Sequence, residues 1–296
     1  MRVAVVGATG LVGSHLVAAL DDRGDEVLAL SRRPTRVGTH ATLTWDPARE
    51  PLPPAAREGL DAIVNLAGAP IAAGRWRAAQ REAIRSSRLT ATRGVVAALG
   101  DDGPRVLVNA SAVGFYGDTE DPVDERTPAG SDFLAGVCVE WEREALVAAD
   151  RARVVVVRSG LVLARDGGAF PPLLRAARVG VLGVMGTGRQ WVPWIHVDDE
   201  VAALLHCLDR SDLASPVNLV APRPERQADV ARLVRRAVHR PPTLPAPSFL
   251  LRAVMGPASA LVLGGQRVVP AALEASGFTF AHPSLEPALT ELLAQA

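Results

Sequence analysis

Three glycines spaced three residues apart follow a short apolar run at the start of the chain. Gly7, Gly10 and Gly13 come directly after Val3–Val6, and the residues beyond them are apolar at helical spacing. This order predicts a buried strand, a tight turn and the start of a helix. Backbone N–H groups and the helix dipole at such a start attract an anion, so we predict a site for the pyrophosphate of a dinucleotide. A tight turn without a ligand is the alternative. The predicted pyrophosphate-binding residues are Gly7, Thr9, Gly10, Leu11, Val12 and Gly13.

The residues after the second and fourth apolar runs indicate which dinucleotide binds. Ser31 and Arg32 stand where an acidic residue would bond the ribose hydroxyls of NAD(H). A hydroxyl beside a guanidinium suits a 2′-phosphate instead, so the sequence favours NADP(H). Loop arginines that only face solvent are the alternative. Leu66, Ala67 and Gly68 follow the fourth run, where small residues let the backbone pass close to a ribose or pyrophosphate.

Two side chains beyond the fifth apolar run could transfer protons. Ser111 and Tyr116 lie where the ends of parallel strands place a substrate carbonyl or hydroxyl, and Tyr116 is the single tyrosine of the chain. Tyr116 would serve as a proton donor if a neighbouring arginine lowered its pKa. A ring packed in the cleft with its hydroxyl hydrogen-bonded is the alternative.

A histidine and two acids end a later apolar run. The ordinary pKa of His196 suits acid–base catalysis, although a structural hydrogen bond would explain this histidine equally well. Asp198 or Asp199 is expected to cap the helix that follows. The acids after Gly117 imply no metal-ligand geometry, and no metal is expected.

Apolar runs alternate with helical segments through the first half of the chain. Continuous apolar runs are typical of strands buried on both faces of a parallel sheet, and the alternation predicts right-handed crossovers. We therefore predict an α/β fold built on a doubly wound parallel sheet. The predicted strands are Val3–Val6, Glu26–Leu30, Ala41–Trp45, Ala62–Leu66, Val106–Asn109 and Arg153–Val157. The predicted helices between them are Gly13–Arg23, Arg75–Leu99 and Asp132–Ala149.

The pattern changes after Arg158, where loops rich in glycine and proline appear. We expect a dinucleotide-binding domain over 1–158 and a smaller, interleaved C-terminal α+β substrate lobe over 159–296, with about 195–222 returning to the first sheet. The predicted helices are Phe170–Arg178, Asp198–Asp209, Gln227–His239, Leu250–Leu263 and Leu285–Leu293, and the predicted strands are Gln190–Trp194 and Pro216–Val220. Arg189, Gln190, Trp191 and Trp194 would suit a ring or a phosphorylated substrate, or would anchor a loop on the core.

Composition excludes several classes of partner. The 32 basic and 32 acidic residues balance, so neither a nucleic acid nor a membrane surface is expected as partner. No long apolar run or charged leader precedes the first strand, and the two cysteines suit a reducing compartment, so we expect a cytoplasmic protein. Every basic residue is arginine, which leaves no lysine ammonium to any mechanism.

These motifs resemble the extended, nucleotide-sugar-epimerase-like branch of the short-chain dehydrogenase/reductase superfamily, whose core is a Rossmann fold. The motifs similar to that branch are Gly7–Gly13, Asn65–Gly68 and Trp194–Asp199. A narrower resemblance, over nearly the whole chain, is to its atypical "epimerase family" subgroup, also labelled cell-division-inhibitor-like, which has a C-terminal domain of unknown function. That resemblance rests on Asn65–Ile71, Arg75–Trp76, Ser87–Arg88, Ser111–Gly117, Trp141–Glu142, Arg158–Leu163, Gly188–Trp191, Asn218–Pro222, Gly265–Pro270 and Gly277–Phe280. It implies NADP(H) binding, with Ser31, Arg32, Leu66, Ala67 and Arg88 at matching cofactor positions, and a homodimer, but no known substrate.

The chain departs from the wider superfamily at the catalytic pair. Active members use Tyr-x-x-x-Lys on the helix after the fifth strand, and the family spacing puts Leu134 and Cys138 at those positions. An ungapped comparison also puts Ala112 at the place of the usual serine, with Ser111 one residue earlier. Our leading hypothesis is an NADP(H)-dependent oxidoreductase or epimerase-like enzyme acting on a small polar substrate, sugar- or phosphate-bearing, with a non-standard proton donor. The alternative is a catalytically degenerate NADP(H)-binding protein that acts as a redox sensor or scaffold.

Overall fold

The computed structural model describes residues 1–72, 74–99, 103–213, 216–241 and 243–294. Its centre is a seven-stranded sheet in which every neighbouring pair is parallel. In spatial order the strands are β13 (Val217–Leu219), β9 (Arg153–Ser159), β7 (Val106–Ala112), β6 (Ala62–Asn65), β1 (Arg2–Val6), β2 (Glu26–Ser31) and β5 (Leu43–Thr44). The prediction of a doubly wound parallel α/β fold is confirmed. The chain leaves β1 towards β5 on one side and then builds outwards from β6 on the other, so the strand order reverses between β1 and β6, where such sheets bind ligands.

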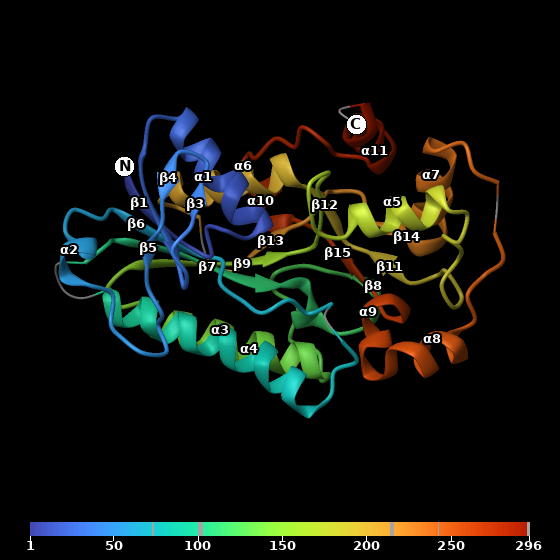
Figure 1. Cartoon of the computed structure of the whole chain (residues 1–296), viewed down its shortest axis with the longest axis horizontal. Helices are drawn as coiled ribbons and strands as arrows, with labels where there is room; N and C mark the ends of the chain where they lie inside the picture. Colours follow the sequence, from blue (N-terminus) through green and yellow to red (C-terminus); the bar gives the residue numbers. More distant parts are fainter. Residues whose placement is uncertain (73, 100–102, 214–215, 242, 295–296) are drawn as a thin grey trace.

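Helices cover both faces of this sheet (Figure 1). One face carries α1 (Leu11–Asp22), α6 (Val197–Asp209) and α10 (Ala271–Ala275), and the other carries α3 (Ala78–Ala98) and α4 (Phe133–Leu146). The two faces alternate along β1, because Val3 and Val5 pack with α1 and α6, whereas Ala4 and Val6 pack on the opposite side. The short α2 (Pro54–Arg57) lies at the end of the sheet away from the C-terminal elements.

Smaller elements make up most of the second half. Three helices, α5 (Phe170–Arg178), α7 (Gln227–Ala237) and α11 (Leu285–Ala294), share one apolar cluster with Trp194. The paired short strands are β10 (Leu161–Leu163) with β12 (Trp194–His196), β11 (Trp191–Val192) with β14 (Glu225–Arg226), β15 (Gln266–Val268) with β8 (Thr119–Val123), and β3 (Arg36–Val37) with β4 (His40–Ala41). The remaining elements are α8 (Ser248–Met255), α9 (Ala260–Leu263) and the 3₁₀ turns η1 (Val113–Tyr116) and η2 (Gly256–Ser259).

Four predicted elements are corrected by the structure. The expected strand Ala41–Trp45 is two short strands with different partners, because β4 pairs with β3 whereas β5 pairs with β2. The expected strand 190–194 is two strands with different partners, because Pro193 has no N–H to donate. The expected helix 250–263 is interrupted where Gly256 adopts a φ of 59° before Pro257. The third helix begins at Ala78 rather than Arg75, because Trp76 has a φ of 54°, outside the helical region.

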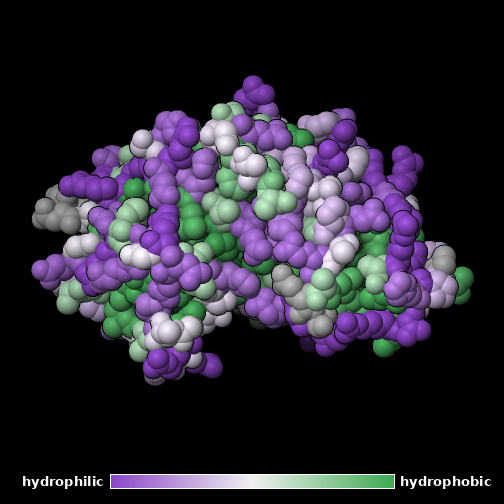
Figure 2. All heavy atoms as spheres, turned by 90° about the horizontal axis from the view of Figure 1, so that it is seen from above, coloured by the Kyte–Doolittle hydropathy of each residue, from purple (hydrophilic) through white to green (hydrophobic). Residues whose placement is uncertain are grey.

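The surface is mixed in character. Figure 2, which views the molecule from above, shows hydrophilic residues over most of this face and an indentation at its lower edge, between the part that holds the main sheet and the part that holds the C-terminal elements. Among the described residues, no helix has both the length and the apolar character needed to cross a bilayer.

Candidate functional site

A cavity of about 1190 Å³ opens at the C-terminal ends of β1, β2 and β6. Most of the sequence-predicted dinucleotide residues line it: Gly7, Thr9, Gly10, Ser31, Arg32, Leu66, Ala67 and Gly68. Helix α1 starts at this cavity with Gly10 as its N-cap and without a side-chain cap, and its first turn carries no acidic residue. The first N–H groups of α1 are therefore left for an anionic ligand.

The glycine turn is tightly constrained at two positions. Gly7 has a φ of 83°, and a Cβ there would lie 3.0 Å from the Leu66 carbonyl carbon. A Cβ on Gly13 would lie 2.2 Å from the Gly7 carbonyl oxygen. Gly13 and Val12 therefore lie behind the cavity wall, where they pack the helix onto the strand, and Leu11 packs against Gly167 and Gly168.

The far end of the cavity is basic. Arg32 and Arg33 are exposed at its rim, and Arg32 makes no hydrogen bond or ion pair within the part of the chain that the structure describes. The Ser31 hydroxyl accepts a hydrogen bond from the Arg33 backbone N–H at 3.3 Å. Arg49 also lines the cavity, and its guanidinium lies 3.3 Å from Asp46. A hydroxyl and unpaired guanidinium groups form the environment that a 2′-phosphate requires.

Sequence reasoning missed one wall of the cavity. Small and hydroxyl side chains of α3 line it at positions three and one apart: Ala83, Ser86, Ser87, Thr90 and Ala91. That spacing places these side chains on one face of α3, and it is the feature of the sequence from which this wall of the cavity could have been predicted. Their small size leaves room for a ligand between α3 and the strand ends.

Arg88 lies beside the cavity on the same helix. One of its terminal nitrogens donates to the carbonyls of Ala69 and Ile84, at 3.1 and 2.9 Å. Its guanidinium lies over the Trp141 ring at 5.0 Å and directly against Gly68. Burial lowers the pKa of Arg88, and among the described residues it has no carboxylate partner. A buried cation without a counter-charge is costly, which points to an anionic or polar ligand as its partner.

Ser111 and Tyr116 are brought together by a buried ion pair. Glu142 of α4 accepts from the Ser111 hydroxyl at 2.7 Å and from two nitrogens of Arg158, each at 2.8 Å. Another nitrogen of Arg158 donates to the Tyr116 hydroxyl at 2.9 Å, and that hydroxyl donates to Asn218 at 2.7 Å. These five residues come from β7, α4, β9, η1 and β13, so the network joins three strands of the sheet to α4 on one of its faces and to the 3₁₀ turn after β7.

The network occupies both hydroxyls. Ser111 is 4% exposed and Tyr116 is 5% exposed, and each hydrogen of their hydroxyls already has an acceptor. Burial raises the pKa of Tyr116, and the neighbouring Arg158 opposes this effect without reversing it. The arginine that the sequence required beside Tyr116 is present, but it does not make the phenol a stronger acid than usual.

Replacing Tyr116 by phenylalanine is expected to lower the free energy of unfolding by about 1 to 3 kcal/mol, because Asn218 and Arg158 lose a buried partner. Denaturant unfolding of wild type and variant checks this value. The affinity for cofactor should stay unchanged. A variant with wild-type stability that has lost all turnover would instead assign the hydroxyl to the chemistry.

Leu134 and Cys138, at the positions of the Tyr-x-x-x-Lys pair of short-chain dehydrogenases/reductases, cannot transfer a proton as that pair does. Leu134 packs against Gly114 of η1, and the Cys138 thiol lies 3.7 Å from the Ala112 carbonyl. Burial raises the pKa of Cys138 to about 11, so the thiol is neutral at physiological pH. The nearby positive charge is Arg88, which opposes that rise.

His196 belongs to a different cluster, with Asp198 and His282. It is 2% exposed, and its Nδ1 accepts from the Asp198 backbone N–H at 3.2 Å, which makes His196 itself the N-cap of α6. The expected cap at Asp198 or Asp199 is therefore wrong; the Asp199 carboxylate instead accepts from the backbone N–H groups of Ala281 and His282. Burial lowers the pKa of His196, and the neighbouring His282 lowers it further.

The polar–aromatic residues between the lobes divide into two groups. Trp194 is buried in the C-terminal core and donates to the Arg223 carbonyl at 3.0 Å, and Gln190 donates to the carbonyls of Met185 and Val262. Two guanidinium groups lie against the Trp191 ring, that of Arg226 at 3.6 Å from the ring centre and that of Arg267 at 5.0 Å. Trp194 and Gln190 thus anchor the loop, and the Trp191 stack remains as the part suited to an anionic ligand.

Comparison with known proteins finds two family models that match successive parts of the chain. Residues 3–221 match the NAD dependent epimerase/dehydratase family, and residues 246–292 match a domain of unknown function, DUF1731. An "epimerase family protein" of Mycobacterium bovis is 42% identical over 290 residues, which cover 97% of this chain and 96% of that protein. Another from Bacillus subtilis, YfhF, is 34% identical and is covered to 98%. The crystal structure of human epimerase family protein SDR39U1 with NADPH superposes with a TM-score of 0.91 at 35% identity, with both chains covered completely.

Proposed function

Because the chain belongs to the NAD dependent epimerase/dehydratase family, with a C-terminal DUF1731 segment, we propose that it binds NADP(H) in the cavity at the ends of β1, β2 and β6. The confirmed resemblance to the atypical epimerase subgroup supports this proposal, as does the NADPH bound to human SDR39U1. The observation that carries it is that one cavity holds both the start of α1, which has no side-chain cap, and, beside Ser31, the guanidinium of Arg32, which has no partner among the described residues.

Each part of the cavity then has a distinct task. The first turn of α1 would hold the pyrophosphate, and Ser31 with Arg32 would hold the 2′-phosphate. Leu66, Ala67 and Gly68 would lie along the ribose, and Arg88 would reach it past Gly68. Arg88 lies near Cys138, the position at which the superfamily has its lysine, so we assign to Arg88 the positive charge that is missing at that position of α4.

The proposed activity is that of an oxidoreductase or epimerase-like enzyme on a small polar substrate. NADPH, when bound, supplies a hydride to an electrophilic carbon, and a proton must reach the adjacent oxygen. Ser111 and Tyr116 remain the candidates closest to the end of β7, and His196, which lies with Asp198 and His282, is a weaker one. Trp191 with Arg226 and Arg267 would suit a phosphate- or sugar-bearing substrate.

One observation favours a second function, that of a cofactor-binding protein without turnover. Both candidate hydroxyls donate inside the buried network, and Leu134 and Cys138 replace the proton-transferring pair. Such a protein would report the NADPH/NADP⁺ ratio through its conformation or stability. A cytoplasmic location and a homodimer remain predictions under either function.

Replacing Arg32 by alanine should weaken NADPH binding by about 10- to 100-fold, because charge-assisted hydrogen bonds contribute about 1.5 to 3 kcal/mol. NADH affinity should change little, since NADH lacks the 2′-phosphate. Parallel fluorescence titrations of both cofactors measure the two effects. Arg36→Ala, which removes the same charge from the neighbouring strand β3, outside the cavity lining, is the matched control. An equal loss of affinity for both cofactors would exclude a 2′-phosphate contact.

A further inference from the structure

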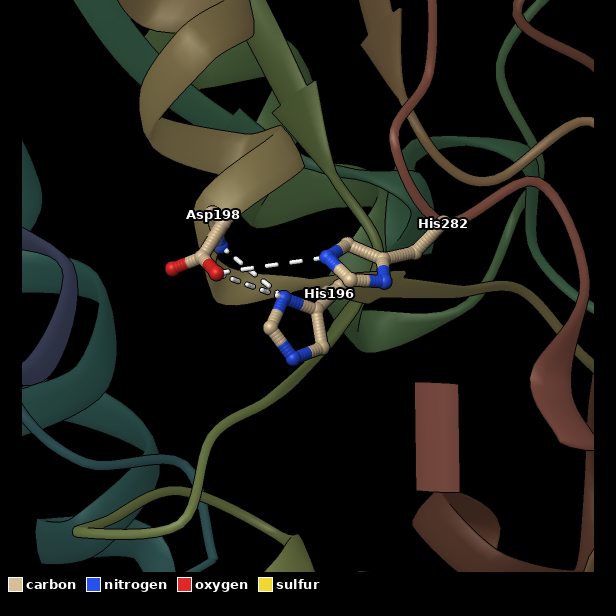
Figure 3. Close-up of side chains that lie close together, drawn as sticks. All are labelled: His196, Asp198 and His282. Atoms are coloured by element: carbon tan, nitrogen blue, oxygen red, sulfur yellow. Dashed lines mark hydrogen bonds and ion pairs between the residues drawn. The ribbon is translucent and has the colours of Figure 1, made fainter. Parts of the chain in front are cut away.

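Three side chains outside the dinucleotide site come together where the C-terminal segment crosses the start of α6. His196 ends β12, Asp198 lies in the first turn of α6, and His282 lies just before α11. Figure 3 shows the two rings beside each other, with one nitrogen of each directed towards the Asp198 carboxylate. Oδ2 of Asp198 lies 3.5 Å from Nδ1 of His196 and 3.9 Å from Nε2 of His282, and the three atoms lie within 4.8 Å of one another.

We propose that His196, Asp198 and His282 form a binding site for one divalent transition-metal ion of the Zn²⁺ or Co²⁺ type. A donor set of two imidazoles and one carboxylate favours such ions over Mg²⁺ and Ca²⁺, because Mg²⁺ and Ca²⁺ take oxygen ligands. The site would leave further coordination positions for water or an external ligand.

The distances allow this with small movements. Bonds of about 2.0 to 2.2 Å to the ion would bring the donor atoms roughly 3 to 3.5 Å apart, so Nε2 of His282 must approach the Asp198 carboxylate by less than about 1 Å and the ligand nitrogen of His196 by up to about 2 Å. The ring centroids lie 3.9 Å apart at an angle of 36°, and the rings would separate slightly to bind at adjacent positions of one ion. The backbone N–H of Asp198 would give up its 3.2 Å bond to Nδ1 of His196, which is at the long end of the hydrogen-bond range.

The surroundings hold His282 as a metal site would need. The Asp199 carboxylate fixes the backbone of His282 and of the residue before it, with bonds of 2.9 and 2.8 Å. Oε2 of Glu291, on α11, lies 3.6 Å from Nδ1 of His282, the nitrogen opposite to the one directed at Asp198. A carboxylate on the outer nitrogen of a metal-bound histidine orients the ring and raises its basicity.

The charge around the site also suits a cation. The first turn of α6 carries the carboxylates of Asp198 and Asp199, and Glu291 approaches from α11. These carboxylates offset the positive end of the α6 dipole, which alone would oppose a cation. A bound ion would tie the C-terminal segment to α6, so binding would stabilise the folded chain by a free energy that rises with the logarithm of the metal concentration.

The test uses the full chain, stripped of metal with a chelator and titrated with Co²⁺ alone. We expect one ion per chain, a visible absorption band from a Co²⁺–imidazole site, competition by Zn²⁺, and a rise in the thermal unfolding midpoint. His282→Ala and Asp198→Asn should each weaken binding by more than about 10-fold, and Glu291→Gln by about 10-fold. His239→Ala, at the far end of α7, should bind as wild type does.

Two outcomes would overturn the site. One is the lack of a saturable Co²⁺ band in wild type at concentrations up to about 100-fold over protein. The other is a band that persists in both His282→Ala and Asp198→Asn, since it would come from other ligands. Because the band reports coordination directly, a variant that is less stable but still folded remains informative. Cofactor titrations are independent of this result, so the NADP(H) proposal stands or fails separately.

Discussion

Glu142→Ala is expected to lower the free energy of unfolding by about 3 to 5 kcal/mol, the cost of leaving one partner of a buried ion pair uncompensated. Arg158, which is 3% exposed, would lose both of its carboxylate contacts, and the Ser111 hydroxyl would lose its acceptor. The Arg158 guanidinium would still lie 3.4 Å from the centre of the Phe115 ring, but an aromatic ring cannot replace a full negative charge. Urea unfolding, followed by circular dichroism, measures the difference.

The matched control is Glu140→Ala on the same helix. Glu140 forms an ion pair of 2.5 Å with Arg85 at the surface, where water screens the attraction, so its removal should leave stability almost unchanged. If both variants unfold alike, the buried network does not carry the stability that we assign to it. Glu142→Gln should fall between the two, because it keeps a hydrogen-bond acceptor but removes the charge.

Gly13→Ala should both destabilise the fold and abolish tight cofactor binding. Its new Cβ would meet the Gly7 carbonyl oxygen at 2.2 Å and the Ala8 Cα at 2.9 Å, and both atoms belong to the turn that forms the cavity wall. To relieve this clash, α1 must move away from the turn, which should lower the free energy of unfolding by about 3 kcal/mol. Because the same movement displaces the first N–H groups of α1, NADPH affinity should fall by more than about 100-fold.

Gly136→Ala is the control for this substitution. Gly136 is also in a helix, but nothing lies within 4 Å of an added Cβ there, and alanine favours a helix over glycine. This variant should therefore be as stable as wild type or more stable by about 0.5 to 1 kcal/mol, with normal binding. Normal NADPH affinity in Gly13→Ala would contradict the role assigned to the turn.

The sheet was predictable because its sequence signals are local. A valine-rich run such as Arg153–Val157 is apolar at successive positions, so both of its faces must be buried, and such runs form the central strands of the sheet. The glycine turn was predictable for the same reason, since its strand, turn and helix start are contiguous. The division of 250–263 at Gly256 was present in the sequence as a Gly-Pro pair, but the apolar spacing around it outweighed that signal.

The rest of the candidate site depends on contacts between distant segments. Tyr116 could be suspected from its place after β7, but its partners Arg158 and Asn218 come from later strands. Their effect on its hydroxyl could not be foreseen from spacing alone. In the same way, the sequence predicted no metal site. His196 and His282 are far apart in the chain, and only the crossing of the C-terminal segment over α6 brings them together.

The central claim is that the cavity beside the glycine turn binds NADP(H), and a direct titration of the purified wild-type chain with NADPH and with NADH tests it. We predict saturable binding of NADPH at one site per chain, with an affinity at least about 10-fold above that for NADH, because only NADPH presents a phosphate to Ser31 and Arg32. Equal or tighter binding of NADH, or no saturable binding of either cofactor, would contradict the account.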